Sequence, residues 1–169
     1  METILNKVEQ SGIVSINLED GLTDATIQEL DLAPILWQGM VLKETDFRQF
    51  VKEHPWNSYT DAHVGVFCSA DAIIPMWAYM LVSSALHPFA KSVVAGNAND
   101  VKNALVMQYV DSLSAESLKD TRVVVKGCGS FESSPAVFMA LTRKLQPVVK
   151  SLMFGEPCST VPIYKVPRK

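Results

Sequence analysis

The sequence lacks most of the motifs that announce a chemical function. Only three cysteines and three histidines occur in 169 residues. No CxxC pair, HxxxH pair or paired cysteine knuckle is present, which excludes the usual zinc-ribbon and thioredoxin arrangements. No GxxxxGK[ST], GxGxxG or GxSxG pattern occurs either, so the chain has no recognisable phosphate loop, dinucleotide fingerprint or nucleophile elbow.

Charge and hydropathy exclude two further classes of protein. The net charge is −3 and no cluster of Lys and Arg is interleaved with aromatics, so we expect no nucleic-acid partner. The longest run without a charge, residues 72–90, has 19 residues but is polar at its C-terminal end, and we predict a core helix rather than a membrane span. Residues 1–10 are polar where a signal peptide would be apolar, and the cysteine count is odd. These features predict a cytoplasmic protein with reduced thiols.

Hydrophobic residues make up 48% of the chain, enough to form a core without disulfides or metals. Their patterns predict strands at 13–18, 62–68, 91–95, 121–126 and 160–166, and helices at 25–37, 44–53, 74–86, 100–113 and 134–153. Pro147 is expected to kink the last helix, and Gly155 to lie just beyond its end. This alternation predicts an α/β fold: a single three-layer domain over residues 1–169, with a mostly parallel sheet and helices on its faces.

The three cysteines each lie at a predicted turn rather than inside an apolar stripe. Cys68 and Cys128 both end a predicted strand ahead of a helix, so we expect them to share the rim where α/β sheets bind ligands. If their strands are neighbours, the two sulfurs could reach one ion, and the following helix N-termini would lower the thiol pKa values. The alternative is that both are ordinary cysteines at strand ends.

Cys158 is harder to place from the sequence. A helix over residues 134–153 would return the chain to the opposite end of the sheet, far from the other two cysteines. Cys158 could rejoin them only if Pro147 breaks that helix, or if the loop through Glu156 and Pro157 runs back before the last strand begins.

His63 and Asp71 are the candidates that would complete a metal site. Three thiolates and one imidazole make a good tetrahedral zinc set. His63, however, precedes Cys68 by five residues, so the two side chains of an unbulged strand point to opposite faces, and a hydrogen-bonded surface histidine is the alternative. Asp71 follows Cys68 by three residues, and its alternative role is the N-cap of the next helix.

Four segments, at residues 42–48, 68–82, 126–128 and 155–165, resemble a bacterial family known only as a domain of unknown function, number 2480. The resemblance covers nearly the whole chain, and all three cysteines lie within these segments. Members of the family are often encoded beside components of iron–sulfur cluster assembly, which implies a link to that pathway and partners among its proteins. The resemblance lends no catalytic residues.

Three hypotheses for function follow. The first is a metal-binding or iron–sulfur-cluster-handling accessory protein, in which the three cysteines are thiolate ligands of Zn or of a cluster and Asp71 or His63 completes the shell. The second is a thiol enzyme or sulfur-transfer protein, with Cys128 as nucleophile and Lys126 helping to hold its thiolate. The third is a non-catalytic interaction module. The sequence leaves open whether the chain is an enzyme and whether it forms a homo-oligomer.

Overall fold

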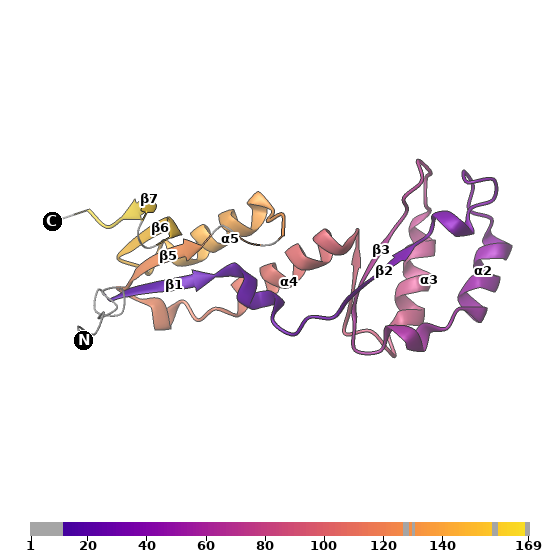
Figure 1. Ribbon diagram of the computed structural model, residues 1–169, viewed down its shortest axis with the longest axis horizontal. Helices are drawn as coiled ribbons and strands as arrows, with labels where there is room; N and C mark the ends of the chain where they lie inside the picture. The colour runs from indigo at the N-terminus through magenta and orange to yellow at the C-terminus, as the bar shows by residue number, and fades with distance from the viewer. Residues whose placement is uncertain (1–11, 127–128, 130, 157–158, 168–169) are drawn as a thin grey trace, which may run out of the picture. The chain divides into compact units, whose positions relative to one another are not determined.

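The computed structural model describes residues 12–126, 129, 131–156 and 159–167 (Figure 1). Its contacts divide the chain into two compact units. The terminal unit consists of Met1–Thr23 and Leu105–Lys169, and the central unit consists of Asp24–Ala104.

Each unit has its own β-sheet, and parallel pairing predominates in both. In the terminal unit the described strands have the order β1-β5-β6-β7, and in the central unit β2-β3-β4. The strands are β1 (Ile13–Asn17), β2 (Ile27–Asp31), β3 (His63–Phe67), β4 (Ser92–Ala95), β5 (Arg122–Lys126), β6 (Ser151–Glu156) and β7 (Ser159–Lys165). The β6–β7 pair is antiparallel and the other pairs are parallel. The predicted α/β class is confirmed, although the strands form two sheets where one was expected. That residues 1–169 are a single domain stays a prediction.

Two helices pack on the sheet of the terminal unit. They are α4 (Ala98–Ser112), whose first half belongs to the central unit, and α5 (Pro135–Leu145). Val110 of α4 and Leu141 of α5 join Ile16, Val123 and Leu152 of the sheet in one buried cluster. The start of α5 is well specified because the Ser134 hydroxyl accepts a hydrogen bond from the Ala136 N–H, and proline, which lacks an N–H, occupies the first helical position.

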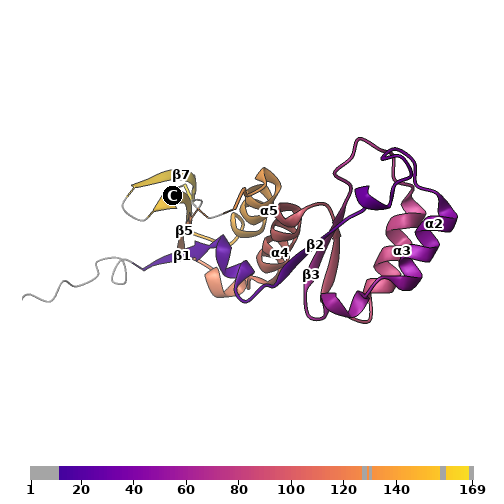
Figure 2. The same ribbon diagram turned by 45° about the vertical axis from the view of Figure 1, so that its right-hand side comes forward.

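The central unit has a second core between its sheet and the helices α2 (Glu44–Glu53) and α3 (Met76–Leu86), which lie side by side in both views (Figures 1 and 2). Phe47 of α2 is fully buried, and its ring meets that of Trp77 edge to face at 5.7 Å between centroids. Short 3-10 turns complete the described elements: η1 (Leu18–Leu22), η2 (Ala33–Ile35), η3 (Trp56–Tyr59) and η4 (Glu116–Leu118).

The start of α4 packs on the central sheet. Glu29 of β2 accepts a hydrogen bond from the Ala98 N–H at 2.7 Å. In register beside it, Gly65 of β3 lies so close to the turn that leads into α4 that an added Cβ would be 2.6 Å from the Gly96 carbonyl oxygen. Only a residue without a side chain allows this approach.

The predicted helix over 25–37 is wrong, because most of that stretch forms β2 and η2. Leu30 and Leu32 are buried in the core of the central unit. Glu29 and Asp31, which alternate with them, make hydrogen bonds elsewhere in that unit. This alternation is the two-residue period of a strand, not the period of a helix.

The predicted helix over 134–153 is wrong in its second half. α5 ends at Leu145, residues 151–156 form β6, and Gly155, expected beyond a helix end, lies inside that strand. Pro147 comes just after the C-cap residue Gln146 and cannot continue the hydrogen-bond ladder, so it ends the helix rather than kinking it. The helix over 44–53 is confirmed at both ends, and the remaining predicted elements are confirmed with small shifts of their bounds. Within the described part of the chain, no helix has the length and apolar character needed to cross a bilayer.

Candidate functional site

The carboxyl edge of the terminal sheet is where β5 and β6 end side by side. Lys126 is the last residue of β5 and Glu156 the last of β6. The Lys126 ammonium lies 3.5 Å from a carboxylate oxygen of Glu156. Because both side chains are partly exposed, such a pair contributes only up to about 1 kcal/mol to stability, but it ties the two strand ends together.

A third chain segment reaches the same edge. Asn17, the last residue of β1, is in register with Lys126. Its side-chain oxygen accepts a hydrogen bond from the Glu19 N–H at 3.2 Å and so starts the turn η1. The carboxylate of Glu19 lies against Gly129, where an added Cβ would be 2.8 Å from Glu19 Oε1. Glu19 was not predicted as a site residue, although its position directly after the predicted strand over 13–18 was a usable signal.

Cys128 and Cys158 lie outside the described residues, but the strands that precede them are described. In the sequence, Cys128 comes two residues after Lys126, and Cys158 comes two residues after Glu156. The helix expected over residues 134–153 ends at Leu145, so the chain does not pass from that helix straight to Cys158. Instead β6 runs parallel to β5 and ends at the same edge.

Cys68 follows a strand of the other sheet. β3 pairs with β2 and β4, so it is not a neighbour of β5, and the expectation that Cys68 and Cys128 share the rim of one sheet is wrong. Cys68 is a half-buried free thiol whose sulfur contacts the Ala70 carbonyl oxygen at 3.6 Å. α3 begins only at Met76, so Cys68 does not lie at a helix N-terminus as predicted. Likewise, α5 begins seven residues after Cys128 in the sequence.

In the part of the chain that the structure describes, His63, Asp71 and Cys68 do not form one metal-binding group. His63 begins β3 whereas Cys68 follows its end, which separates them by roughly 15 Å along the strand. The His63 Nδ1 atom is 2.8 Å from the Ser92 hydroxyl, in line with the alternative of a hydrogen-bonded histidine. Burial, with the nearby positive charge of Lys91, lowers the His63 pKa. Asp71 is exposed and is not the N-cap of α3, because Pro75 occupies that position.

Asp31 organises the carboxyl edge of the central sheet. Its carboxylate accepts hydrogen bonds from the Ser69 N–H at 2.9 Å, the Ser69 hydroxyl at 2.5 Å and the Ala33 N–H at 2.9 Å. Partial burial raises the pKa of Asp31, but these hydrogen bonds outweigh that effect and leave the pKa below its ordinary value. Asp31 therefore holds the loop after β3 in place. This role was not predicted, because residues 25–37 were expected to form a helix.

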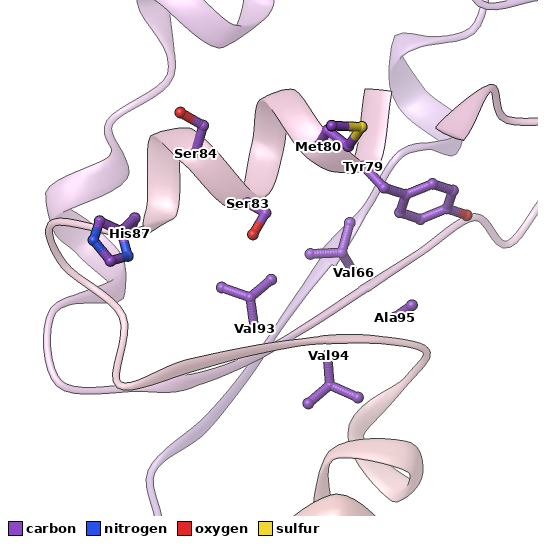
Figure 3. A pocket seen from close by; sticks show the side chains of 9 residues that line it. All are labelled: Val66, Tyr79, Met80, Ser83, Ser84, His87, Val93, Val94 and Ala95. Carbon is purple, nitrogen blue, oxygen red and sulfur yellow. The ribbon is translucent and has the colours of Figure 1, made fainter. Parts of the chain in front are cut away.

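A hollow of about 640 Å³ lies between α3 and β4 in the central unit. Figure 3 shows Ser83 and Val93 turned toward each other across it, with His87 at one end and Tyr79 at the other. Of the hydrogen bonds described, none joins the Ser83 or Ser84 hydroxyl to the His87 ring, so these residues form no paired nucleophile and base.

Across the residues that the structure describes, no group of three His, Cys, Asp or Glu side chains is close enough to hold a metal ion. The model of one protein family, described as "Protein of unknown function (DUF2480)", matches residues 2–166. The chain belongs to this family. The DUF2480 match confirms the resemblance seen in the sequence over nearly its whole length. Comparison with curated proteins and with solved structures gave no match.

Proposed function

We propose that the chain is a cytoplasmic accessory protein that binds a metal ion or an iron–sulfur cluster through cysteine thiolates, with Cys128 and Cys158 at the centre of the site. One observation carries the proposal: β5 and β6 are adjacent parallel strands whose last residues, Lys126 and Glu156, are joined by an ion pair. Each cysteine follows its strand by two residues in the sequence.

The reach of the chain supports this proposal. Adjacent strands lie about 4.8 Å apart, and two residues extend at most about 7 Å from a strand end. Cys128 and Cys158 lie outside the described residues, but the strand ends that precede them are close enough to allow the two thiolates to meet. Zinc and iron–sulfur sites need sulfur atoms that converge on one centre, and neighbouring strand ends allow two sulfur atoms to do so.

A carboxylate lies at the same edge. Glu19 lies against Gly129, one residue after Cys128 in the sequence, and zinc accepts carboxylate oxygen together with sulfur. Soft thiolates favour zinc, copper(I) or iron–sulfur clusters over magnesium or calcium. Cys68, His63 and Asp71 belong to the central unit. Their roles as ligands stay predictions, and the Cys68→Ser variant below tests that of Cys68.

The test is elemental analysis and visible absorption of protein purified without oxygen. We expect a stoichiometric amount of zinc or iron in the native chain, and loss of most of it in Cys128→Ser and in Cys158→Ser. Glu19→Gln should reduce metal occupancy, whereas Asp20→Asn, which removes the neighbouring carboxylate, should not. Cys68→Ser tests the third predicted thiolate: loss of metal would add Cys68 to the ligands, and retention would remove it.

Two results would count against the proposal. One is well-folded native protein that carries neither metal and takes up none on anaerobic reconstitution. The other is metal content that survives in the double variant of Cys128 and Cys158. If the protein is metal-free and Cys128 is alkylated with a pKa well below about 8.5, the thiol enzyme or sulfur-transfer hypothesis takes its place. Under the proposed function, the expected partners are iron–sulfur assembly proteins.

A further inference from the structure

A second hollow, of about 870 Å³, opens at the amino end of the parallel strands in the terminal unit, at the edge opposite to Lys126 and Glu156. One wall of the hollow is a row of residues that are in register across the four described strands of the sheet. Ile13 of β1 is in register with Arg122 of β5, Arg122 with Ser151 of β6, and Ser151 with Lys165 of β7. Residues in register across a sheet project from the same face, so this row lines one surface.

The hollow gathers positive charge in a chain that is negative overall. Of the described residues that line it, Arg122, Lys150 and Lys165 are cationic and Asp120 is the one carboxylate, which leaves two positive charges in excess. All three cations are exposed, and none has an ion pair within the described part of the chain. Adjacent strands lie about 4.8 Å apart, so Arg122 and Lys165 are separated by about 10 Å at their backbones and can approach one ligand from two sides.

The rest of the lining is apolar or aromatic. Met153, Pro162 and Val166 contribute hydrophobic surface, and Tyr164 adds an aromatic ring with a hydroxyl group. A hollow of this size is large enough for a ligand of nucleotide size. Its lining therefore offers surface for an apolar or planar body as well as charge for an anionic group.

We propose that this hollow binds a small phosphate-bearing molecule, with Arg122, Lys150 and Lys165 contacting the phosphate and Met153 and Pro162 contacting an apolar or planar body. An arginine guanidinium binds phosphate oxygens through two parallel hydrogen bonds, and lysines add charge from other directions. The two positive charges in excess match a phosphate dianion. Like charges at one surface repel one another, and a bound dianion relieves that repulsion. This site is independent of the thiolate site proposed above.

The experiment is a titration of the full-length chain with AMP, with inorganic phosphate and with uncharged adenosine. Two-dimensional 1H–15N NMR spectra monitor each titration. AMP should shift the amide signals of residues 120–122, 150–153 and 163–166, and inorganic phosphate should shift those near Arg122 and Lys165. The dissociation constant for AMP should rise about tenfold or more in Arg122→Gln and in Lys165→Gln, as expected for loss of a charge-assisted hydrogen bond. Adenosine should bind at least about tenfold more weakly than AMP for the same reason.

Arg143→Gln is the matched control, because it removes one exposed positive charge from α5 of the same unit, and Arg143 does not line the hollow. It should leave the AMP affinity within about twofold, since distant exposed charges are screened by salt. The proposal is overturned if AMP produces no shifts at these residues, if Arg143→Gln weakens binding as much as Arg122→Gln, or if adenosine binds as tightly as AMP. Arg122 and Lys165 are exposed at strand ends, so both variants should fold, and their amide spectra verify this.

Discussion

Single residues carry much of the specific geometry of this chain, and Gly65 is the clearest case. It is buried in the middle strand of the central sheet, where the turn before α4 comes closest. The contact that excludes a side chain is with backbone, the Gly96 carbonyl oxygen, so rotation of a neighbouring side chain cannot relieve it. Val101 Cγ2 would also lie 3.1 Å from an added Cβ.

The Gly65→Ala variant should therefore be destabilised by about 1–3 kcal/mol, because overpacking forces the turn or the strand to move. Urea unfolding followed by circular dichroism measures this as a lower midpoint with an unchanged slope. Adding Val101→Ala should recover only a small part of the loss, since the clash with the Gly96 carbonyl remains. A Gly65→Ala protein as stable as the native chain would contradict the close approach.

At the scale of the element, the stability of the central unit depends on how α2 docks beside α3. Phe47 joins these helices through its contact with Trp77, and its ring also lies 5.9 Å from that of Phe50. Burying one aromatic side chain fully contributes more than several exposed apolar residues. The α2 helix is short and polar on its outer face, so it depends on this anchor.

Phe47→Ala should lower the free energy of unfolding by about 3–5 kcal/mol, through lost burial and the cavity left behind. Met80→Ala on α3 is the control, because Met80 is 71% exposed and its loss should change stability by no more than about 0.5 kcal/mol. Thermal and urea unfolding give both values. Equal effects of the two substitutions would show that α2 does not depend on Phe47.

At the scale of the whole molecule, three described groups make stability depend on pH in the same direction. Burial lowers the pKa values of His54 and His63, and hydrogen bonds lower that of Asp31 against the opposing effect of burial. For each group the unfolded chain binds a proton at a higher pH than the folded chain. The free energy of unfolding should therefore fall as the pH falls.

The decrease should occur in two windows: one below the ordinary histidine value of 6.5 and one below the ordinary aspartate value of 3.8. Asp31→Asn should reduce the slope in the acidic window, and His63→Gln should reduce it in the upper window. Urea midpoints measured from pH 8 to pH 3 check both. If stability stayed constant between pH 7 and pH 5, the lowered histidine pKa values would be wrong.

The sequence predicted most elements but not their grouping. Apolar period and caps are local signals, which is why the helix over 44–53 and the strand over 121–126 were found. The prediction of a helix over 25–37 failed because the apolar spacing of the whole stretch is ambiguous, and the alternation around Leu30 and Leu32 identifies a strand only once their common core is known. The predicted end of the last helix was wrong because Pro147 is compatible with both a kink and a helix end. Only the pairing of β6 with β5 decides between them.

The candidate site was predicted only in part. Cys128 and Lys126 were predicted from their place at a strand end, but the contacts of Glu19 with Gly129 and of Glu156 with Lys126 were not. The reason is that three segments far apart in sequence end at one edge, which depends on strand order.

By itself, the sequence determined the α/β class, because the burial of one face of a strand or helix produces a local period of apolar residues. The same elements placed the candidate thiols at predicted turns. Only the tertiary structure decided that the strands divide between two sheets, that β5 and β6 end at one edge, and that Arg122 and Lys165 line one hollow. Strand order and register arise from packing between distant segments, and no local pattern specifies them.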